Sequence, residues 1–296
     1  MSTPDGRDLM RRAEALPCWR GPATAEPLAG GLTNANFLVR DRADRYVVRI
    51  GGDIPVHQVL RFNELAASRA AAAAGLAPEV VHAEPGVLVL HFVDGRTLGP
   101  ADFADAGILS RVAELLRRCH REVALHLRGP VVTFWPFHIV RDYAATLRAG
   151  GSAWTGELPR LLGLADRLAR ALGPVEIAFT HNDLLAANII DDGARLWLID
   201  WEYAGFGAAA FDLANLATNN GLDRDRERAL LAHYFGRAPD AHELRAHAIM
   251  RAASLLREAM WGMVSEIHST LDVDYRAYAA DHLARLEVAL SELPSE

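Results

Sequence analysis

The chain has 296 residues, a length that suits one large domain or two lobes around a sizeable hydrophobic core. Its formal net charge of −7, without a basic stripe, argues against a nucleic-acid partner. No apolar run approaches the roughly 18 residues of a membrane span, no apolar signal core follows the charged N-terminus, and Cys18 and Cys119 are too few for a disulfide framework. We therefore expect a cytoplasmic protein with no membrane partner.

The first ninety residues favour strands around a single helix. Apolar runs bounded by turn residues predict strands over 25–28, 37–39, 46–50, 80–81 and 87–90. Alanine-rich composition with spaced apolar residues predicts a helix over 56–74, which Gly75 and Pro78 terminate.

The remainder is mostly helical by apolar periodicity. Helices are expected around 108–119 and over 139–149, 158–172, 224–235, 241–268 and 274–292, with strands over 175–179 and 195–199. Residues 92–95 form a natural hinge between a strand-rich N-lobe (1–92) that would bind nucleotide and a helical C-lobe (93–296) that would carry catalysis and substrate binding. The predicted fold class is α+β, in two lobes.

One loop carries the chemistry. Asp183 is followed after five residues by Asn188 and after twelve more by Asp200, and a strand-like apolar run precedes each aspartate. Phosphoryl transfer needs one carboxylate at the attacking hydroxyl and oxygen ligands for the ions that neutralise the phosphates. The same residues could simply cap a turn. His181 is interpreted as a structural residue that bonds backbone behind the loop, and Asp212 as a brace for the loop or a helix cap.

A phosphate-transfer site also needs a cation that a helical carboxylate holds in place. All 31 basic side chains are arginine, so an arginine must serve. Arg49 ends the third expected strand and Glu64 lies in the next helix; the alternative is two unrelated surface residues. The segment Gly30, Gly31, Leu32, Thr33 and Asn34 could bring backbone amides against phosphates, although a plain hairpin has the same pattern.

Together these segments resemble the choline/ethanolamine kinase family, within the aminoglycoside phosphotransferase-like group of kinase-fold enzymes. The resemblance rests on residues 30–34, 181–183 with 188, 198–203, 211–215, 261–263 and 274–278. It implies that Asp183 is the catalytic base, that Asn188 and Asp200 bind Mg²⁺, and that Arg49 with Glu64 serves ATP beside the turn residues Gly30, Gly31, Thr33 and Asn34. It also places Glu202, Tyr203, Trp261 and Tyr278 near an amino-alcohol pocket.

The expected reaction is transfer of the ATP phosphoryl group to a small cationic alcohol, choline first and ethanolamine next. Aromatic faces and a carboxylate suit a quaternary ammonium, but Trp261 and Tyr278 could equally be core residues, and Val264 stands where choline kinases often have a second tryptophan. An aminoglycoside, thiamine or a sugar is the alternative substrate, and a nucleotide-binding pseudo-kinase scaffold the alternative class. A homodimer is left open.

Overall fold

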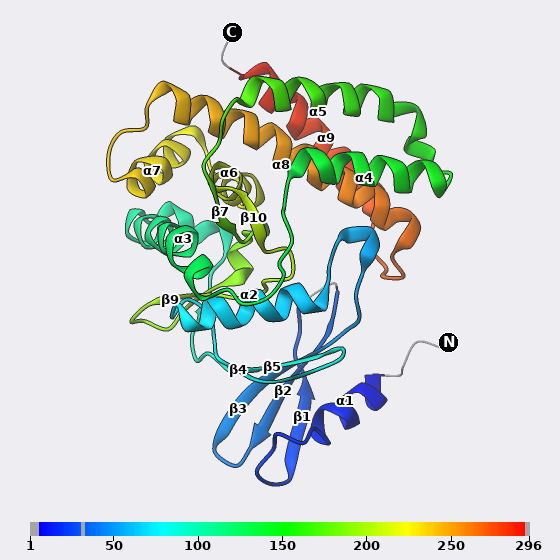
Figure 1. Ribbon diagram of the computed structural model, residues 1–296, viewed down its shortest axis with the longest axis vertical. Coiled ribbons are helices and arrows are strands. Elements are labelled where there is room, and N and C mark those ends of the chain that lie inside the picture. The colour runs from blue at the N-terminus through cyan, green and yellow to red at the C-terminus, as the bar shows by residue number, and fades with distance from the viewer. Residues whose placement is uncertain (1–5, 31–32, 294–296) are drawn as a thin grey trace.

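The computed structural model describes residues 6–30 and 33–293 and divides into a small sheet and a larger helical part (Figure 1). The N-terminal part holds an antiparallel five-stranded sheet in the order β1-β2-β3-β5-β4. Its strands are β1 (Ala23–Pro27), β2 (Ala35–Asp41), β3 (Asp44–Ile50), β4 (Val80–Glu84) and β5 (Val87–His91). All five expected strands are confirmed, and Arg49 lies on the third.

A short helix, α1 (Gly6–Glu14), which the sequence analysis did not predict, packs on this sheet. Ala13 and Leu16 join Phe37, Val39 and Val48 in a separate small core. The helix is polar on average, but its apolar residues follow helical spacing, so the sequence analysis overlooked a pattern that was present.

Helix α2 (Arg61–Ala73) connects the two parts, and in Figure 1 it crosses between the sheet and the helices above it. The expected start at residue 56 was wrong, because Pro55–His57 form a 3₁₀ turn and Gln58 adopts a left-handed conformation with φ of 60°. The alanines of α2 pack with Leu116 of α3 (Ala106–His126) in one of the two core clusters of the C-terminal part, whereas Glu64 faces Arg49 of the sheet. The helix therefore belongs to the interior of both parts.

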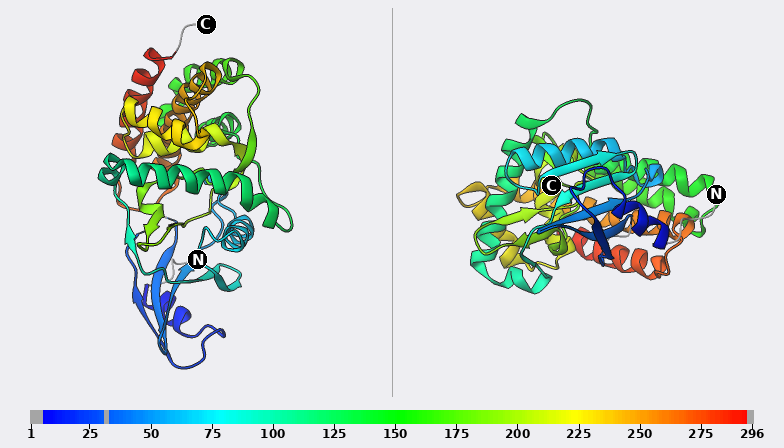
Figure 2. Two further views of the ribbon diagram at one scale, coloured as in Figure 1. Left: turned by 90° about the vertical axis from the view of Figure 1, so that its left-hand side faces the viewer. Right: turned by 90° about the horizontal axis from the view of Figure 1, so that it is seen from below.

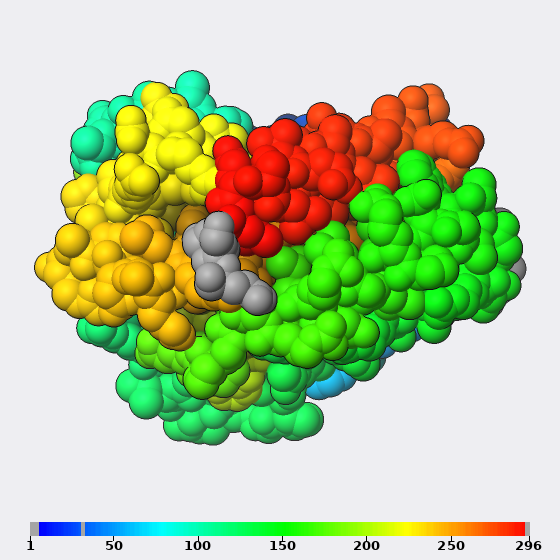
Figure 3. Space-filling view, turned by 90° about the horizontal axis from the view of Figure 1, so that it is seen from above, coloured from blue at the N-terminus to red at the C-terminus, as the bar shows by residue number. Residues whose placement is uncertain are grey.

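The C-terminal part is a helical assembly around one long buried helix. Its helices are α3 (Ala106–His126), α4 (Pro136–Ala149), α5 (Leu158–Leu172), α6 (Ala209–Asn219), α7 (Arg224–Phe235), α8 (Ala241–His268) and α9 (Tyr275–Ser291). Helices α4, α5, α6 and α9 all contact α8. The views in Figure 2 show the helical part gathered at one end and the sheet at the other, and in Figure 3 α9 runs across the top beside α5. The expected helices are confirmed, but α3 extends seven residues beyond the expected end at 119, and α6 was not among the expected ranges.

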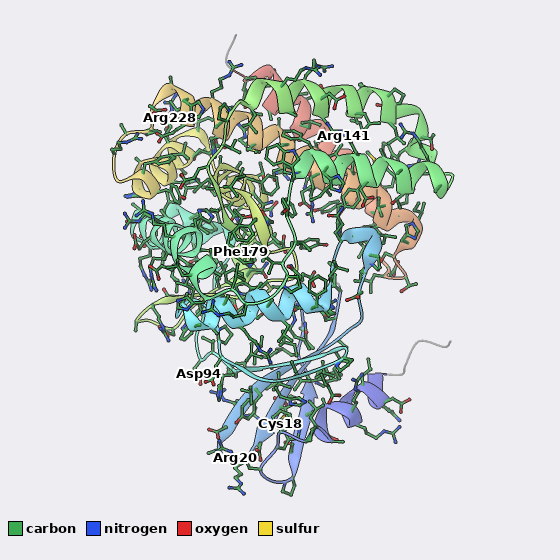
Figure 4. The ribbon with its side chains drawn as sticks, viewed as in Figure 1. Cys18, Arg20, Asp94, Arg141, Phe179 and Arg228 are labelled. Carbon is green, nitrogen blue, oxygen red and sulfur yellow. The ribbon has the colours of Figure 1, made fainter. Side chains whose placement is uncertain are left out.

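Short strands lie between the two parts and present the loops of interest. β7 (Ile177–Thr180) pairs with β10 (Gly205–Ala208), and β8 (Ile189–Asp191) pairs with both β6 (Arg96–Thr97) and β9 (Leu196–Leu198). Phe179 of β7 is fully buried in the helical part, and Asp94 lies in the connection that follows the sheet (Figure 4). Within the described residues, no helix is long and apolar enough to span a membrane.

The core cluster that contains Leu116 should be sensitive to the loss of that side chain from α3. Leu116 has no exposed surface, so Leu116→Ala should lower the free energy of unfolding by about 2–5 kcal/mol through lost burial and a residual cavity. Leu125 lies on the same helix but is 70% exposed, and Leu125→Ala should cost under about 0.5 kcal/mol. Denaturant unfolding of both variants tests this, and similar losses would contradict the assigned helix face.

Candidate active site

The loop between β7 and β8 is held from below by Asp212 of α6. The buried carboxylate accepts the backbone N–H of His181 at 2.8 Å and that of Asn182 at 2.7 Å, and it also contacts His120 Nε2 at 2.9 Å. Asn182 has a positive φ of 69°, and its side chain donates to the Tyr203 carbonyl at 3.0 Å. Asp212 is thus confirmed as a brace rather than a helix cap, and it fixes the two residues that precede Asp183.

His181 has the structural role expected of it. Its ring is fully buried, and Nε2 lies 2.9 Å from the Ile199 carbonyl oxygen. Burial lowers the pKa of His181, which favours the neutral ring. The contact joins the loop to the segment that carries Asp200.

Asp183 and Asn188 are in direct contact. Asn188 Nδ2 donates to the Asp183 backbone oxygen at 2.9 Å and to its carboxylate at 3.3 Å, which leaves the Asn188 amide oxygen free for another partner. Burial and the nearby Glu258 raise the pKa of Asp183 to about 7, while Arg257 acts in the opposite direction. Such a carboxylate is poised to accept a proton near neutral pH.

Strand pairing brings Asp200 to Asn188. The Ile199 N–H donates to the Asn188 carbonyl at 3.0 Å, directly beyond the β8–β9 ladder, and Asp200 follows with a φ of 66°. A positive φ is uncommon for a residue with a side chain and often marks a functional site. The geometry therefore unites the three residues that the sequence separates by up to 17 positions.

Arg49 bridges a buried cluster of carboxylates between the sheet and the C-terminal part. Its Nε lies 3.0 Å from Glu64, and its Nη2 lies 2.5 Å from Asp200 and 3.6 Å from Glu202. Burial opposes the charged guanidinium, but Asp200 and Glu64 raise the pKa of Arg49 overall. The expected Arg49–Glu64 pair is confirmed, and it also reaches the candidate metal ligand.

The same carboxylates fit a divalent cation. Ligand oxygens of Glu64, Asp200 and Glu202 lie within 4.8 Å of one another, and the Asn188 amide oxygen is free nearby. Mg²⁺ prefers such oxygen ligands and usually binds only one or two protein carboxylates. The donor set suits this ion, provided that Arg49 moves away from Asp200 when the ion binds.

Glu202 is drawn towards the N-terminal part. Its carboxylate accepts the Thr33 hydroxyl at 2.8 Å, Arg61 Nη1 at 3.1 Å and the Asn34 amide at 3.5 Å. The structure therefore places Thr33 and Asn34 at this carboxylate. Arg61, which the sequence analysis missed, also contacts Glu64 at 2.6 Å.

Two cavities meet at this cluster. One, of about 390 Å³, lies between the sheet and the C-terminal part, and its walls include Gly30, Arg49 and Phe92. Gly30 has a φ of 110°, and a Cβ there would meet nothing within 4 Å, so its backbone is open to a ligand. Gly31 lies outside the described residues. Asn188 and Asp200 line this cavity and also the second one.

The second cavity, of about 310 Å³, contains Asp183 and an aromatic wall. Trp261 and Tyr278 are half-buried, their ring centroids lie 5.6 Å apart, and Trp261 Nε1 donates to the Tyr203 hydroxyl at 3.1 Å. Both rings line this cavity, and Trp261 also packs against the hydrophobic core of the C-terminal part. Val264 is fully buried in the core and is absent from the cavity lining.

Arg257 and Glu258 of α8 also line this cavity, and the sequence analysis missed them. They precede Trp261 by four and three residues, a spacing that puts all three on one side of a helix. An ionic pair inside an otherwise apolar helical pattern was the available signal. Both side chains are buried.

The fold and the paired cavities define a kinase-fold phosphotransferase. The family model for choline/ethanolamine kinase matches residues 25–231. The chain therefore belongs to the choline/ethanolamine kinase family.

Individual relatives agree with this assignment. Ethanolamine kinase 2 from Mus musculus is 28% identical over 84% of this chain and 71% of its own length. The crystal structure of a choline/ethanolamine kinase family protein from Mesorhizobium loti has 29% identity and a TM-score of 0.78, with 97% of this chain and 95% of that chain covered. A spectinomycin phosphotransferase in complex with ADP and spectinomycin shares the fold at 12% identity and a TM-score of 0.62, covering 96% and 97%. Membership of this kinase family implies that the chain uses a nucleotide.

The buried Arg49–Glu64 pair should be energetically coupled. A double-mutant cycle with Arg49→Ala and Glu64→Ala, read by denaturant unfolding, should give a coupling energy of about 1–3 kcal/mol, because either single change leaves a buried charge with fewer partners. The exposed Arg40–Glu26 pair of the same sheet, at 3.1 Å, is the matched control and should give about 1 kcal/mol or less. Equal coupling in the two cycles would refute the importance of burial.

Proposed function

We propose that the protein transfers the γ-phosphoryl group of ATP to the hydroxyl of a small amino alcohol, choline or ethanolamine. The observation that carries this proposal is the junction of the two cavities, where Asn188 and Asp200 line both and Asp183 lies in the smaller one. The nucleotide would occupy the cavity between the sheet and the C-terminal part, and the alcohol would occupy the second, aromatic cavity. The phosphoryl group would then be transferred between the two cavities beside Asn188 and Asp200, which line both.

Each polar residue has a role in this arrangement. Asp183 accepts the hydroxyl proton and orients the alcohol, while Asn188 holds the Asp183 carboxylate through its amide N–H. The amide oxygen of Asn188 and the carboxylate of Asp200 would hold Mg²⁺, which when bound neutralises phosphate charge. Arg49 binds phosphate oxygens with its planar fork, and Glu64 keeps the guanidinium in place. Gly30, Thr33 and Asn34 belong to the segment that would cover the phosphates.

The second cavity supports a small cationic substrate. Its volume of about 310 Å³ is at the lower end of small-molecule sites. Carboxylates and the rings of Tyr203, Trp261 and Tyr278 attract positive charge. The names of the relatives, choline and ethanolamine kinases, agree with this choice.

A screen of ADP release tests the proposal. Purified protein with ATP and Mg²⁺ would be offered choline, ethanolamine, thiamine, an aminoglycoside and a simple sugar. We expect the highest kcat/KM for one of the two amino alcohols, and no turnover with excess chelator. Preference for thiamine, an aminoglycoside or the sugar would replace the substrate class, and nucleotide binding without turnover on any alcohol would indicate the pseudo-kinase scaffold.

Asp183→Asn should abolish most turnover without unfolding the protein. The amide is nearly isosteric but cannot accept the hydroxyl proton, so kcat should fall by about 10²–10⁴-fold while the KM for ATP changes little. Asp166 lies on α5 and forms an exposed ion pair with Arg141 of α4. Asp166→Asn serves as the matched control and should keep wild-type kinetics. Steady-state kinetics measure the loss of turnover, and thermal unfolding checks that the variant remains folded. Near-normal turnover would show that Asp183 is not the base.

A further inference from the structure

Glu258 is the carboxylate of the aromatic cavity with acceptor capacity to spare. Arg257 Nη1 donates to Oε1, and the Tyr278 hydroxyl donates to Oε2 at 3.0 Å. An ionised carboxylate offers about four acceptor positions, so these two bonds leave room for a ligand. The side chain is only 5% exposed yet lines the cavity beside Trp261.

The sequence analysis placed a different carboxylate, Glu202, near the amino-alcohol pocket, but Glu202 already accepts hydrogen bonds from other residues. It already accepts bonds from Thr33, Asn34 and Arg61, and Arg49 lies 3.6 Å away. Glu202 lines the same cavity as Glu258, but these donors from the N-terminal part already occupy its carboxylate. A cation entering the aromatic cavity finds less free acceptor capacity there than at Glu258.

Arg257 holds Glu258 in position. Its guanidinium carbon lies 4.5 Å from the centre of the Tyr203 ring and 5.9 Å from that of Phe134. Nε and Nη2 have no hydrogen-bond partner within the described residues, and these ring faces supply the compensating contacts. The guanidinium is therefore tied to the cavity wall, and its one ionic bond orients the Glu258 carboxylate.

We propose that Glu258 is the specificity-determining carboxylate that binds the positively charged head of the substrate, with Arg257 as its positioning residue. This inference rests on the proposed amino-alcohol kinase function and names the group that selects the cation. Trp261, one turn along α8, presents its ring beside the same carboxylate. An ammonium with N–H groups can donate to Glu258 directly, whereas a trimethylammonium is held by charge and ring contact alone.

The test separates charge recognition from shape. Choline would be compared with its neutral isostere 3,3-dimethylbutan-1-ol, and both with ethanolamine, as substrates of the wild-type protein and of Glu258→Gln. The amide keeps an acceptor for Tyr278 but removes the charge. We expect the KM for ethanolamine to rise on the order of tenfold to a hundredfold and that for choline by less, with the KM for ATP and that for the neutral alcohol unchanged.

Two further variants keep the result interpretable. Glu258→Gln leaves Arg257 as a buried unpaired charge and should be less stable, so the double variant Arg257→Met with Glu258→Gln removes both charges and should recover stability without recovering cation affinity. Glu266→Gln, on the same helix but bonded to Trp154, is the matched control and should behave as wild type.

Several outcomes would overturn the inference. Unchanged KM for both amino alcohols in Glu258→Gln would do so, as would an equal loss for the neutral isostere, which would indicate a structural role. The proposed function fails separately: a wild-type protein that phosphorylates neither amino alcohol, yet binds tetramethylammonium in calorimetry more tightly than Glu258→Gln does, would refute the kinase substrate class and support the cation site.

Discussion

The structure depends on the compensation of buried charge between its two parts. Arg49 is 8% exposed, and burying its charge alone would be costly. Its guanidinium lies beside the carboxylates of Glu64 on α2 and of Asp200 and Glu202, which follow β9. Each of these carboxylates is in turn hard to bury without Arg49 or Arg61. The cluster therefore joins the sheet to the segment that carries Asp200.

That coupling has a consequence for ligand binding. Glu64, Asp200 and Glu202 converge as a cation site would, and the guanidinium of Arg49 supplies the positive charge there. If a divalent ion binds here, Asp200 would be one of its ligands, and Arg49 would be available to pair with phosphate oxygens.

The substrate side relies on a second buried network of a different kind. Asp212 holds the backbone around Asp183 rigidly through two N–H bonds, while α8 presents Arg257, Glu258 and Trp261 to the opposite wall. The proposed base is thus held by backbone bonds, and the proposed cation-binding wall is held by the packing of a long buried helix. Separation of the two functions onto different elements would allow the wall to vary among related enzymes while the base stays in place.

Much of the protein could be predicted from local sequence. The spacing of Asp183, Asn188 and Asp200, the position of Arg49 on the third strand and the long helices 224–235 and 241–268 follow from motif and periodicity, because these features are encoded over short stretches. Helix α1 is short and polar on average, and the helical spacing of its apolar residues was overlooked. The start of α2 shifted because the chain turns at Gln58.

Only the tertiary structure decided how charges are shared. Glu202 accepts hydrogen bonds from Thr33, Asn34 and Arg61, and it lies 3.6 Å from Arg49. All four residues are more than 140 positions away in the sequence, so no local pattern predicts these contacts. The sequence placed Glu202, Tyr203, Trp261 and Tyr278 in one pocket, but it did not show that Glu258 lies there with free acceptor positions. Side-chain identity determines which chemistry is available, whereas long-range packing determines which of several carboxylates is left open to a substrate.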